Sequence, residues 1–236
     1  VAINKEKINQ AILSVSIGFA VKQDASDDMT KVFKKAEDDM YRHKLSESSS
    51  MRSKTIDLIM NSLYIKSHRE MLHSKRVSEL CEAIAIKMNF KNDDINRLRI
   101  AGLMHDIGKI GIPDHLLNKM GKLDGNKRNE MERHSEVGYR ILSSVNEFSE
   151  IADYVLEHHE RWDGKGYPGG IKGKDISLQA RIIAIADSYD AMTSDRTYWK
   201  RLRKKEARDE IRRCSGRQFD PEIVKIFIEK VLGKVW

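Results

Sequence analysis

The chain is organised around one stretch, Ala101-Gly-Leu-Met-His105-Asp106-Ile-Gly-Lys109-Ile-Gly-Ile-Pro113. In this stretch an apolar helical run ends in the adjacent His105 and Asp106, and a glycine-containing turn that carries Lys109 follows. The pattern is a poor end for a hydrophobic helix but a good way to hold a metal ion beside a phosphate. Considered alone, the doublet is explained more simply by a core histidine and a misplaced aspartate, so the other helices decide between the two interpretations.

The other predicted helices carry the same residue types. Histidine or aspartate stands on or at the end of a helical pattern, next to apolar residues, at His73, His134, His158-His159 and Asp187. A single buried histidine usually belongs to a core, whereas five or six that face inward need protons, partners or metal ions. Imidazole nitrogen and carboxylate oxygen together suit iron, manganese or zinc. The sequence therefore favours a metal centre built from several helices.

The two doublets indicate how many ions this centre holds. Neighbouring residues on a helix point about 100° apart, so His105-Asp106 and His158-His159 do not easily serve one ion. They suit a pair of ions about 3.5 to 4 Å apart that share a carboxylate and a water-derived ligand. The competing interpretation of His158-His159 is a polar helix end that the two histidines cap.

Length and composition exclude some classes of function. The 236 residues, 40% hydrophobic and 33% charged, are typical of a soluble globular protein, and no apolar run approaches the ~20 residues of a membrane span. The net charge of +7 favours anionic partners. Nine basic residues between Arg196 and Arg213 are interrupted by acidic ones, which predicts a solvated face rather than a surface for a nucleic acid polymer. Cys81 and Cys214 form no motif, which favours a reduced, cytoplasmic chain. Because the chain starts at Val1 without methionine, we expect a fragment or a processed protein.

The first 50 residues differ in pattern from the rest. Residues 11–21 alternate apolar and small polar residues and predict a strand, and residues 29–44 have one apolar helical face. Ser46-Glu-Ser-Ser-Ser50 interrupts this face and predicts a linker. One strand and one helix do not make a stable domain, so they must pack on other residues or belong to a larger domain.

From Ser53 onward the periodicity predicts helices almost throughout, so the fold class is mainly α. One helix is expected around Met131 to Leu142 and another over 151–160. A glycine-rich loop over 161–178 is long enough to be functional. A helix over 179–192 and two shorter ones follow, the last of them after Asp220-Pro221.

The N-terminal stretch resembles the closing strand and helix of a GGDEF, or diguanylate cyclase, domain. The resemblance rests on two segments, Ser14-Val-Ser-Ile-Gly18 and Ala36-Glu-Asp-Asp-Met-Tyr41-Arg-His-Lys44. Glu37 and His43 depart from the family pattern, and the nucleotide-binding turn is absent. The resemblance implies a truncated remnant over residues 1–47 without cyclase chemistry, followed by a second domain over residues 48–236.

The second domain resembles the HD-GYP branch of the HD phosphohydrolase superfamily. The resemblance rests on motifs in the family's order, namely His73-Ser-Lys-Arg76-Val, His105-Asp-Ile-Gly-Lys109-Ile-Gly-Ile-Pro113, Glu132-Arg-His134-Ser-Glu-Val-Gly138, His158-His-Glu160-Arg-Trp-Asp163-Gly-Lys-Gly166-Tyr167-Pro168, Arg181-Ile-Ile-Ala-Ile-Ala-Asp187-Ser-Tyr-Asp190-Ala-Met-Thr-Ser-Asp195-Arg196 and Gln218-Phe219-Asp220-Pro221. It implies an HD-type helical bundle that hydrolyses cyclic di-GMP to linear pGpG or GMP in bacterial signalling.

The resemblance also implies roles for individual residues. The metal ligands would be His73, His105, Asp106, His134, His158, His159 and Asp187, with Asp106 bridging two ions that are iron or manganese. Asp106 and Lys109 would be catalytic, with Lys109 neutralising charge on the phosphoryl group. Substrate contacts would come from Lys109, Tyr167, Arg196, Trp199 and Lys200.

Two departures from the family pattern matter. Members with a third ion have a glutamate four residues before the first histidine, where this chain has Arg69, with Glu70 one residue out of register. We therefore expect two ions. The family commonly has Pro-Tyr-(Arg/Lys) after Arg196, whereas this chain has Thr197-Tyr198-Trp199. This change predicts altered substrate preference.

Other functions stay open at this point. The chain could be a non-catalytic sensor of the dinucleotide or a module that binds a cyclase, with its ligands kept for structure. It could also hydrolyse a related cyclic dinucleotide or a nucleotide phosphate. The complete ligand set with Lys109 favours turnover, since a binding module gains little from an activated water. A GGDEF-domain protein and a second copy of the chain are the candidate protein partners.

Overall fold

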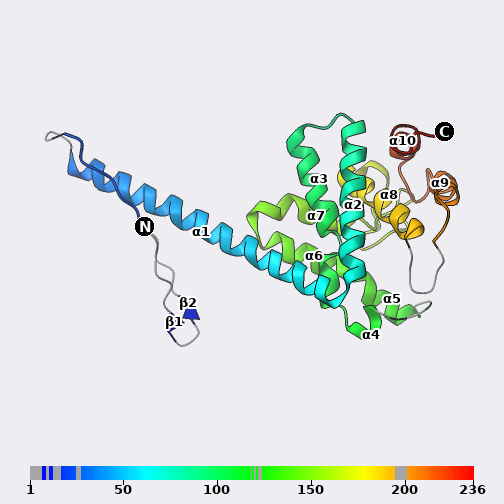
Figure 1. Cartoon of the computed structure of the whole chain (residues 1–236), viewed down its shortest axis with the longest axis horizontal. Coiled ribbons are helices and arrows are strands. Elements are labelled where there is room, and N and C mark those ends of the chain that lie inside the picture. Colours follow the sequence, from blue (N-terminus) through cyan, green and yellow to red (C-terminus); the bar gives the residue numbers. More distant parts are fainter. Residues whose placement is uncertain are drawn as a thin grey trace. The chain divides into compact units, whose positions relative to one another are not determined.

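The computed structural model describes residues 7–8, 11–12, 17–24, 28–117, 119, 121, 124–194 and 201–236, without the side chains of residues 7–8, 11–12, 38 and 41–57. The chain divides into two compact units, Val1–Thr55 and Ile56–Trp236. Helix α1, Met29–Lys66, begins in the first unit and ends in the second (Figure 1). Within the described ranges, no helix combines the length and the apolar content needed to span a membrane.

The first unit contains a short antiparallel pair of strands, β1 (Lys7–Ile8) and β2 (Ala11–Ile12). The predicted strand over 11–21 is wrong for Ile17–Val21, which lies outside any strand. This segment lies against α1 instead, because the Phe19 amide donates to Asp39 at 3.3 Å. A Cβ atom on Gly18 would lie 2.0 Å from the carbonyl oxygen of Ala36, so glycine permits this close approach.

The predicted linker at 46–50 is also wrong, because α1 continues through it without interruption. No glycine or proline occurs between Met29 and Lys66. Serine weakens a helix only modestly compared with those two residues, so a serine-rich stretch alone does not end one. The boundary between the two units, Thr55/Ile56, falls inside this helix.

The second unit is helical, as the mainly α prediction requires. After α1 its α-helices are α2 (His68–Lys87), α3 (Asn92–Met104), α4 (Asp114–Leu117), α5 (Gly125–Glu132), α6 (His134–Ser143), α7 (Ser149–Glu157), α8 (Leu178–Thr193), α9 (Lys204–Arg213) and α10 (Pro221–Ile226). Its described residues also form the short 3-10 helices η1 (Ile107–Gly111), η2 (Asn146–Phe148) and η3 (Gly173–Asp175), and the π-helical turn η4 (Phe227–Val231). The single helix expected around Met131 to Leu142 is two helices, α5 and α6, which meet at Arg133.

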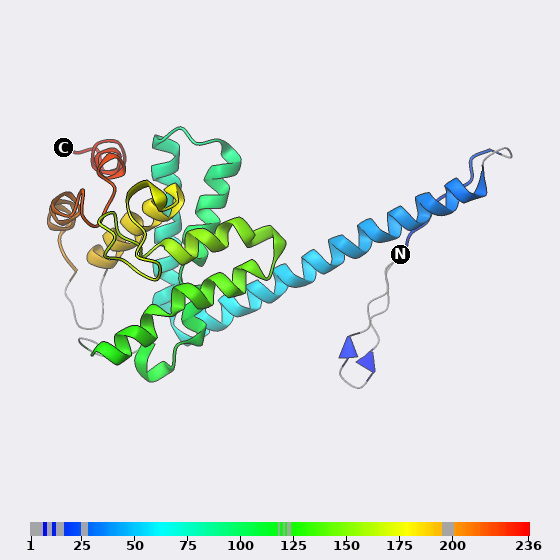
Figure 2. The same ribbon diagram turned by 180° about the vertical axis from the view of Figure 1, so that it is seen from behind.

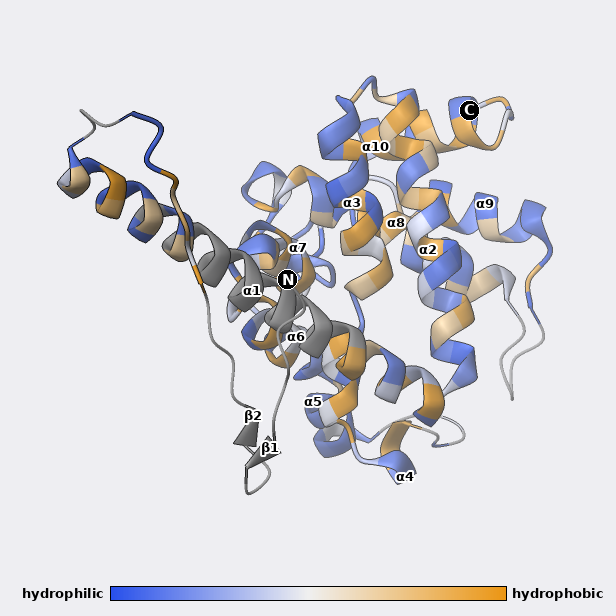
Figure 3. Ribbon diagram, turned by 60° about the vertical axis from the view of Figure 1, so that its left-hand side comes forward, coloured by the Kyte–Doolittle hydropathy of each residue, from blue (hydrophilic) through white to orange (hydrophobic). Residues whose placement is uncertain are grey.

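The core of this unit lies between α2 and its neighbours. Helix α2 packs against α3 and α8, and α6 packs against α7, which lies beside it in both Figure 1 and Figure 2. The largest fully buried side chains include Ile84, Leu98, Leu142, Ile182, Ile183 and Phe227. Hydrophobic and hydrophilic residues alternate around these helices (Figure 3), as expected when one face of each is buried. This packing brings α2, α3, α6, α7 and α8 around one point.

Candidate metal centre

The candidate ligands stand mainly at helix ends. His105 follows the last residue of α3, and Asp106 precedes η1. His134 is the first residue of α6, and His158 follows the last residue of α7. The predicted helix over 151–160 therefore ends at Glu157, three residues early. Because both doublets have left their helices, the 100° argument does not restrict them, and His158 and His159 turn toward the same group of ligands.

A close contact between glycines positions the first doublet. A Cβ atom on Gly108 would lie 1.9 Å from the carbonyl oxygen of His134 and 2.5 Å from the amide nitrogen of Gly138. Only glycine fits at this point, and η1 therefore lies directly against α6. The contact places Asp106 and Lys109 beside His134.

In four histidines of the centre, the Nδ1 atom lies within hydrogen-bond distance of an oxygen acceptor. The Nδ1 atoms of His105, His134 and His158 lie 2.9, 2.7 and 2.6 Å from the carbonyl oxygens of Gly102, Met131 and Val155, each three residues earlier. The Nδ1 atom of His73 lies 2.7 Å from Asp190 Oδ2. A carbonyl oxygen only accepts, so each Nδ1 next to one must carry the hydrogen and the Nε2 atom is left with a free lone pair.

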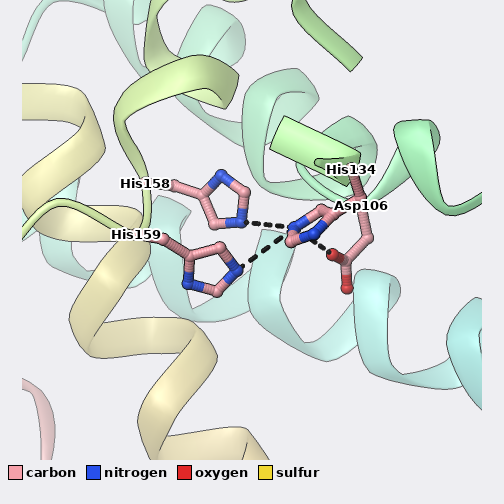
Figure 4. Close-up of side chains that lie close together, drawn as sticks. All are labelled: Asp106, His134, His158 and His159. Atoms are coloured by element: carbon pink, nitrogen blue, oxygen red, sulfur yellow. Dashed lines mark hydrogen bonds and ion pairs between the residues drawn. The ribbon is translucent and has the colours of Figure 1, made fainter. Parts of the chain in front are cut away.

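Two of these Nε2 atoms, those of His134 and His158, face each other, and the Nε2 atom of His159 lies beside them. The Nε2 atom of His134 lies 3.5 Å from that of His158 and 3.2 Å from that of His159 (Figure 4). The Nε2 atom of His105 is buried, and its close polar neighbour is the carboxylate of Asp106, 3.1 Å away. Lone pairs that face each other in a buried site are unfavourable unless a cation lies between them. The donor set of this centre therefore fits a metal ion.

Asp106 is shared by two groups of ligands. One group contains Asp106, His134, His158 and His159, and the other contains His73, His105 and Asp106. Asp106 Oδ1 lies 3.4 Å from His134 Nε2, whereas Oδ2 lies 3.1 Å from His105 Nε2 and 3.7 Å from His73 Nε2. The two oxygens thus face different groups, which is the arrangement of a carboxylate that bridges two ions.

Two aspartates of α8 flank the ring of His73. Asp187 Oδ1 lies 3.1 Å from Nε2 of this ring, on the side of Asp106. Asp190 lies on the opposite side, at Nδ1, and also receives two hydrogen bonds from Arg76. The other six predicted ligands therefore lie around Asp106, whereas Asp190 is not among the predicted ligands.

The two groups differ in their pKa shifts. Burial alone would lower the pKa of His73, but hydrogen bonds with Asp187 and Asp190 outweigh it and raise that pKa to about 9. In the other group burial and the neighbouring His134 lower the pKa of His159 to about 3. Burial would raise the pKa of Asp106, yet His105 and Lys109 lower it well below its ordinary value. A carboxylate that stays ionised when buried attracts cations.

Lys109 lies at the edge of the centre. Its Nζ atom is 2.6 Å from Asp106 Oδ2 and 2.8 Å from Glu70 Oε2. Burial would lower the pKa of Lys109, but these two carboxylates raise it, so the ammonium stays charged. Glu70, which is 4% exposed, also accepts from Arg69 at 3.1 Å. Glu70, which stands one position away from the glutamate that binds a third ion in some family members, therefore pairs with Lys109.

A cavity of about 460 Å³ opens onto the centre. Its lining includes Asp106, Lys109, His134 and Asp187 from the centre, and Tyr167 from the long loop. The ring of Tyr167 stacks on that of His159, with 4.7 Å between centroids and 30° between planes.

The loop from Arg161 to Ser177 folds back to present Tyr167. A Cβ atom on Gly166 would lie 2.5 Å from the Cα atom of Glu160 and 2.6 Å from the carbonyl oxygen of His159, so the chain can return this closely only with glycine. Glu160 Oε1 accepts from the amides of Gly169 and Gly170 at 2.6 and 3.0 Å. A carboxylate that accepts hydrogen bonds from two main-chain amides holds the loop in one conformation.

The residues predicted for the site and those that the structure describes there overlap only in part. Arg196, Trp199 and Lys200, the remaining predicted substrate contacts, lie outside the described residues. The roles of Asp190, Glu70 and Glu160 were missed. Only for Asp190 does the sequence hold a signal, because it follows Asp187 by three residues and so shares its helical face.

Comparisons with known proteins identify a family and several relatives. A family model described as HD domain matches residues 57–223. A cyclic di-GMP phosphodiesterase of Thermotoga maritima is 41% identical over 169 residues, which cover 70% of this chain and 45% of that protein. The 3'3'-cGAMP-specific phosphodiesterase 2 of Vibrio cholerae is 35% identical, covering 72% of this chain and 33% of that protein. The chain thus spans less than half the length of these relatives.

Solved structures share the fold. A cyclic GMP-AMP-specific phosphodiesterase of V. cholerae has a TM-score of 0.57 at 18% identity, covering 75% of this chain and 49% of that one. An HDG"Y"P protein of Bdellovibrio bacteriovorus has a TM-score of 0.59 at 18% identity, covering 80% of this chain and 63% of that one. Since the family model matches most of the chain, the chain belongs to the HD domain family.

Proposed function

We propose that this member of the HD family is a metal-dependent phosphodiesterase that hydrolyses cyclic di-GMP to linear pGpG or GMP. The observation that carries the proposal is Asp106, whose two oxygens face two separate groups of imidazole ligands on the wall of a cavity. An aspartate shared in this way is the arrangement needed for two ions that act on one phosphodiester. The relatives described above are named for the same reaction class.

The proposed centre holds two divalent ions. One would be held by Asp106, His134, His158 and His159, and the other by His73, His105 and Asp106 with Asp187 beside them. Mixed nitrogen and oxygen donors without cysteine suit iron or manganese. When bound, such ions polarise a phosphoryl oxygen and lower the pKa of a coordinated water.

The protein's own groups orient the substrate. Lys109 presents a fixed positive charge, held by Asp106 and Glu70, to the phosphoryl group whose negative charge grows during hydrolysis. Tyr167, supported by His159, offers an aromatic face to a base. We propose that Arg196, Trp199 and Lys200 add phosphate and base contacts.

A related cyclic dinucleotide is the alternative substrate. The relatives include both cyclic di-GMP phosphodiesterases and 3'3'-cGAMP-specific ones at similar identity. The two molecules share phosphates and differ in one base, so Asp106 and Lys109 would serve either of them. Base contacts would then decide between them, among which Trp199 departs from the family pattern.

The test is to measure bound metal after anaerobic purification and then turnover of cyclic di-GMP and 3'3'-cGAMP. The native protein should contain two ions per chain and hydrolyse at least one of the two. Asp106→Ala should lose both ions and activity, on the order of 1,000-fold or more, because one side chain serves both groups. Two bound ions without hydrolysis of any cyclic dinucleotide would contradict the proposed enzymatic activity and favour a non-catalytic sensor.

The N-terminal unit receives a separate proposal. We infer that residues 1–47 are a GGDEF remnant without activity, attached to an HD-GYP domain over residues 48–236. A chain that begins at residue 48 should then keep the turnover of the full chain. We further propose a cytoplasmic location, supported by two unpaired cysteines, Cys81 and Cys214. A homodimer and a GGDEF-domain protein are the proposed partners, which light scattering and co-purification would test.

A further inference from the structure

His73 is held differently from the other three anchored histidines. The Nδ1 atoms of His105, His134 and His158 each donate to a main-chain carbonyl oxygen, which no side-chain substitution removes. The Nδ1 atom of His73 instead lies 2.7 Å from Asp190, 117 residues along the chain. Of these four rings, only that of His73 depends on another side chain for its orientation.

Asp190 is itself held in place behind this ring by two other side chains. It is 3% exposed, and its Oδ1 and Oδ2 atoms receive hydrogen bonds from Arg76 Nε at 2.5 Å and Nη2 at 3.0 Å. Ser194 Oγ donates to Oδ1 at 3.0 Å. A bidentate guanidinium compensates the buried charge, so the carboxylate stays ionised and fixed in place.

The helical spacing explains how one ring meets two carboxylates. His73 and Arg76 are three residues apart on α2, and Asp187 and Asp190 are three residues apart on α8, which packs against α2. Residues three apart lie on one face of a helix. Asp187 therefore reaches Nε2 of the His73 ring while Asp190 reaches Nδ1.

We propose that Asp190 is a positioning residue of the metal centre, which fixes the hydrogen of His73 on Nδ1 and directs the Nε2 lone pair toward Asp106. The inference rests on the metal centre of the proposed function and adds a residue to it. A carboxylate behind a histidine ligand orients the ring and makes it a stronger donor, and losing such a partner typically weakens metal binding about 10–100-fold.

The competing explanation is a purely structural ion pair. Asp190 and Arg76 join α8 to α2, and a lost ion pair of this kind would lower the stability of the whole unit. General loosening would weaken both groups of ligands together. Loss of a positioning residue would weaken only the group that contains His73 and His105, and this difference separates the two explanations.

The experiment uses the full chain, stripped of metal and dialysed against graded concentrations of free Mn²⁺. Asp190→Ala should bind one of two ions about 10–100-fold more weakly and the other as the native protein does. Asp190→Asn keeps an acceptor without the charge, so its shift should be smaller. The paramagnetic resonance signal of a coupled manganese pair should give way to that of a single ion in the same concentration range.

Ser78→Ala is the matched control. Ser78 lies on α2, is buried, and donates to the carbonyl oxygen of Arg99 at 2.7 Å, so its loss lowers stability without touching the centre. It should lower the melting temperature and leave both affinities unchanged. Equal weakening of both ions in Asp190→Ala, or no weakening, overturns the inference. A native protein that binds fewer than two ions contradicts the metal centre itself.

Discussion

The two groups of ligands that share Asp106 have opposite electrostatics. In one, burial and neighbouring imidazoles hold the pKa of His158 and His159 below the ordinary value. In the other, hydrogen bonds with Asp187 and Asp190 outweigh burial and raise the pKa of His73. Apart from the shared Asp106, the first group is therefore a set of neutral nitrogen donors, whereas Asp187 and Asp190 add further carboxylates to the second. The difference shows how one helical bundle gives two adjacent groups of ligands unequal environments.

After the loss of Asp106 itself, removing the charge next to this shared carboxylate should have the largest effect. Lys109 bonds to Asp106 Oδ2, the oxygen that faces His73 and His105. Lys109→Met should lower kcat about 100-fold, the effect typical of losing one group that stabilises transition-state charge. Both ions should stay bound because Lys109 is not a ligand. Steady-state kinetics and metal analysis of the same sample check both statements.

Lys66→Met is the matched control for this prediction. Lys66 is as buried as Lys109 and also makes two contacts, with the carbonyl oxygen of Ile112 and with Asp114, but both lie away from the centre. The control should lower stability and leave kcat within about threefold. An equal fall in kcat for both variants would show that Lys109 acts only through folding.

The unequal pKa values predict a maximum in the stability of the metal-free protein. The raised pKa of His73, about 9, adds stability that is complete below pH 6.5 and is lost as the pH rises through 9. The pKa of His159 is lowered to about 3 in the folded chain. Between pH 6.5 and pH 3 the unfolded chain therefore binds a proton at this residue and the folded chain does not. Acidification to pH 4.5 should thus cost about 2–3 kcal/mol through His159 alone.

Denaturant unfolding of the chelated protein at pH 4.5, 6.5 and 8.5 measures this profile. Stability should be highest near pH 6.5 and fall on both sides. Saturating Mn²⁺ should flatten the alkaline side, because bound metal replaces the proton of His73. A steady rise in stability from pH 4.5 to pH 8.5 would show that the carboxylates around His73 do not raise its pKa.

The smallest effect is expected at Tyr167, which stacks on His159 of the neutral group. Tyr167→Ala removes the stacked face and should raise KM about tenfold, since aromatic stacking on a base contributes ~1–3 kcal/mol. Tyr167→Phe keeps the face and should stay within about threefold of the native KM. If the Phe variant matched the Ala variant, the hydroxyl group would be the substrate contact.

The sequence predicts much of this fold and part of the site. Helical periodicity locates α8 and the long loop before it, because the recurrence of apolar residues every three to four positions is a local property of the sequence. The ends of helices are less well predicted, as α7 shows by ending before His158. The prediction of a linker at the serine-rich stretch within α1 is wrong, since composition alone does not reveal whether a helix continues.

The partners of buried side chains were harder to predict. Glu70 pairs with Lys109 across 39 residues, and Asp190 with His73 across 117. These pairs depend on how η1 and α8 lie against α2, and close approaches such as that of Gly108 to His134 are visible only in three dimensions. A motif indicates which residues carry chemistry, but not which of them hold the others in place.

By itself the sequence determined the donor types, their order and the mainly helical fold. Helix periodicity and the chemistry of imidazole and carboxylate are encoded residue by residue. Only the tertiary structure decided which oxygen of Asp106 faces which group, that His158 and His159 turn toward the same group, and that His73 lies between two aspartates of α8. These facts depend on the packing of distant helices, because an imidazole has two nitrogens and the fold alone selects the one that faces the metal.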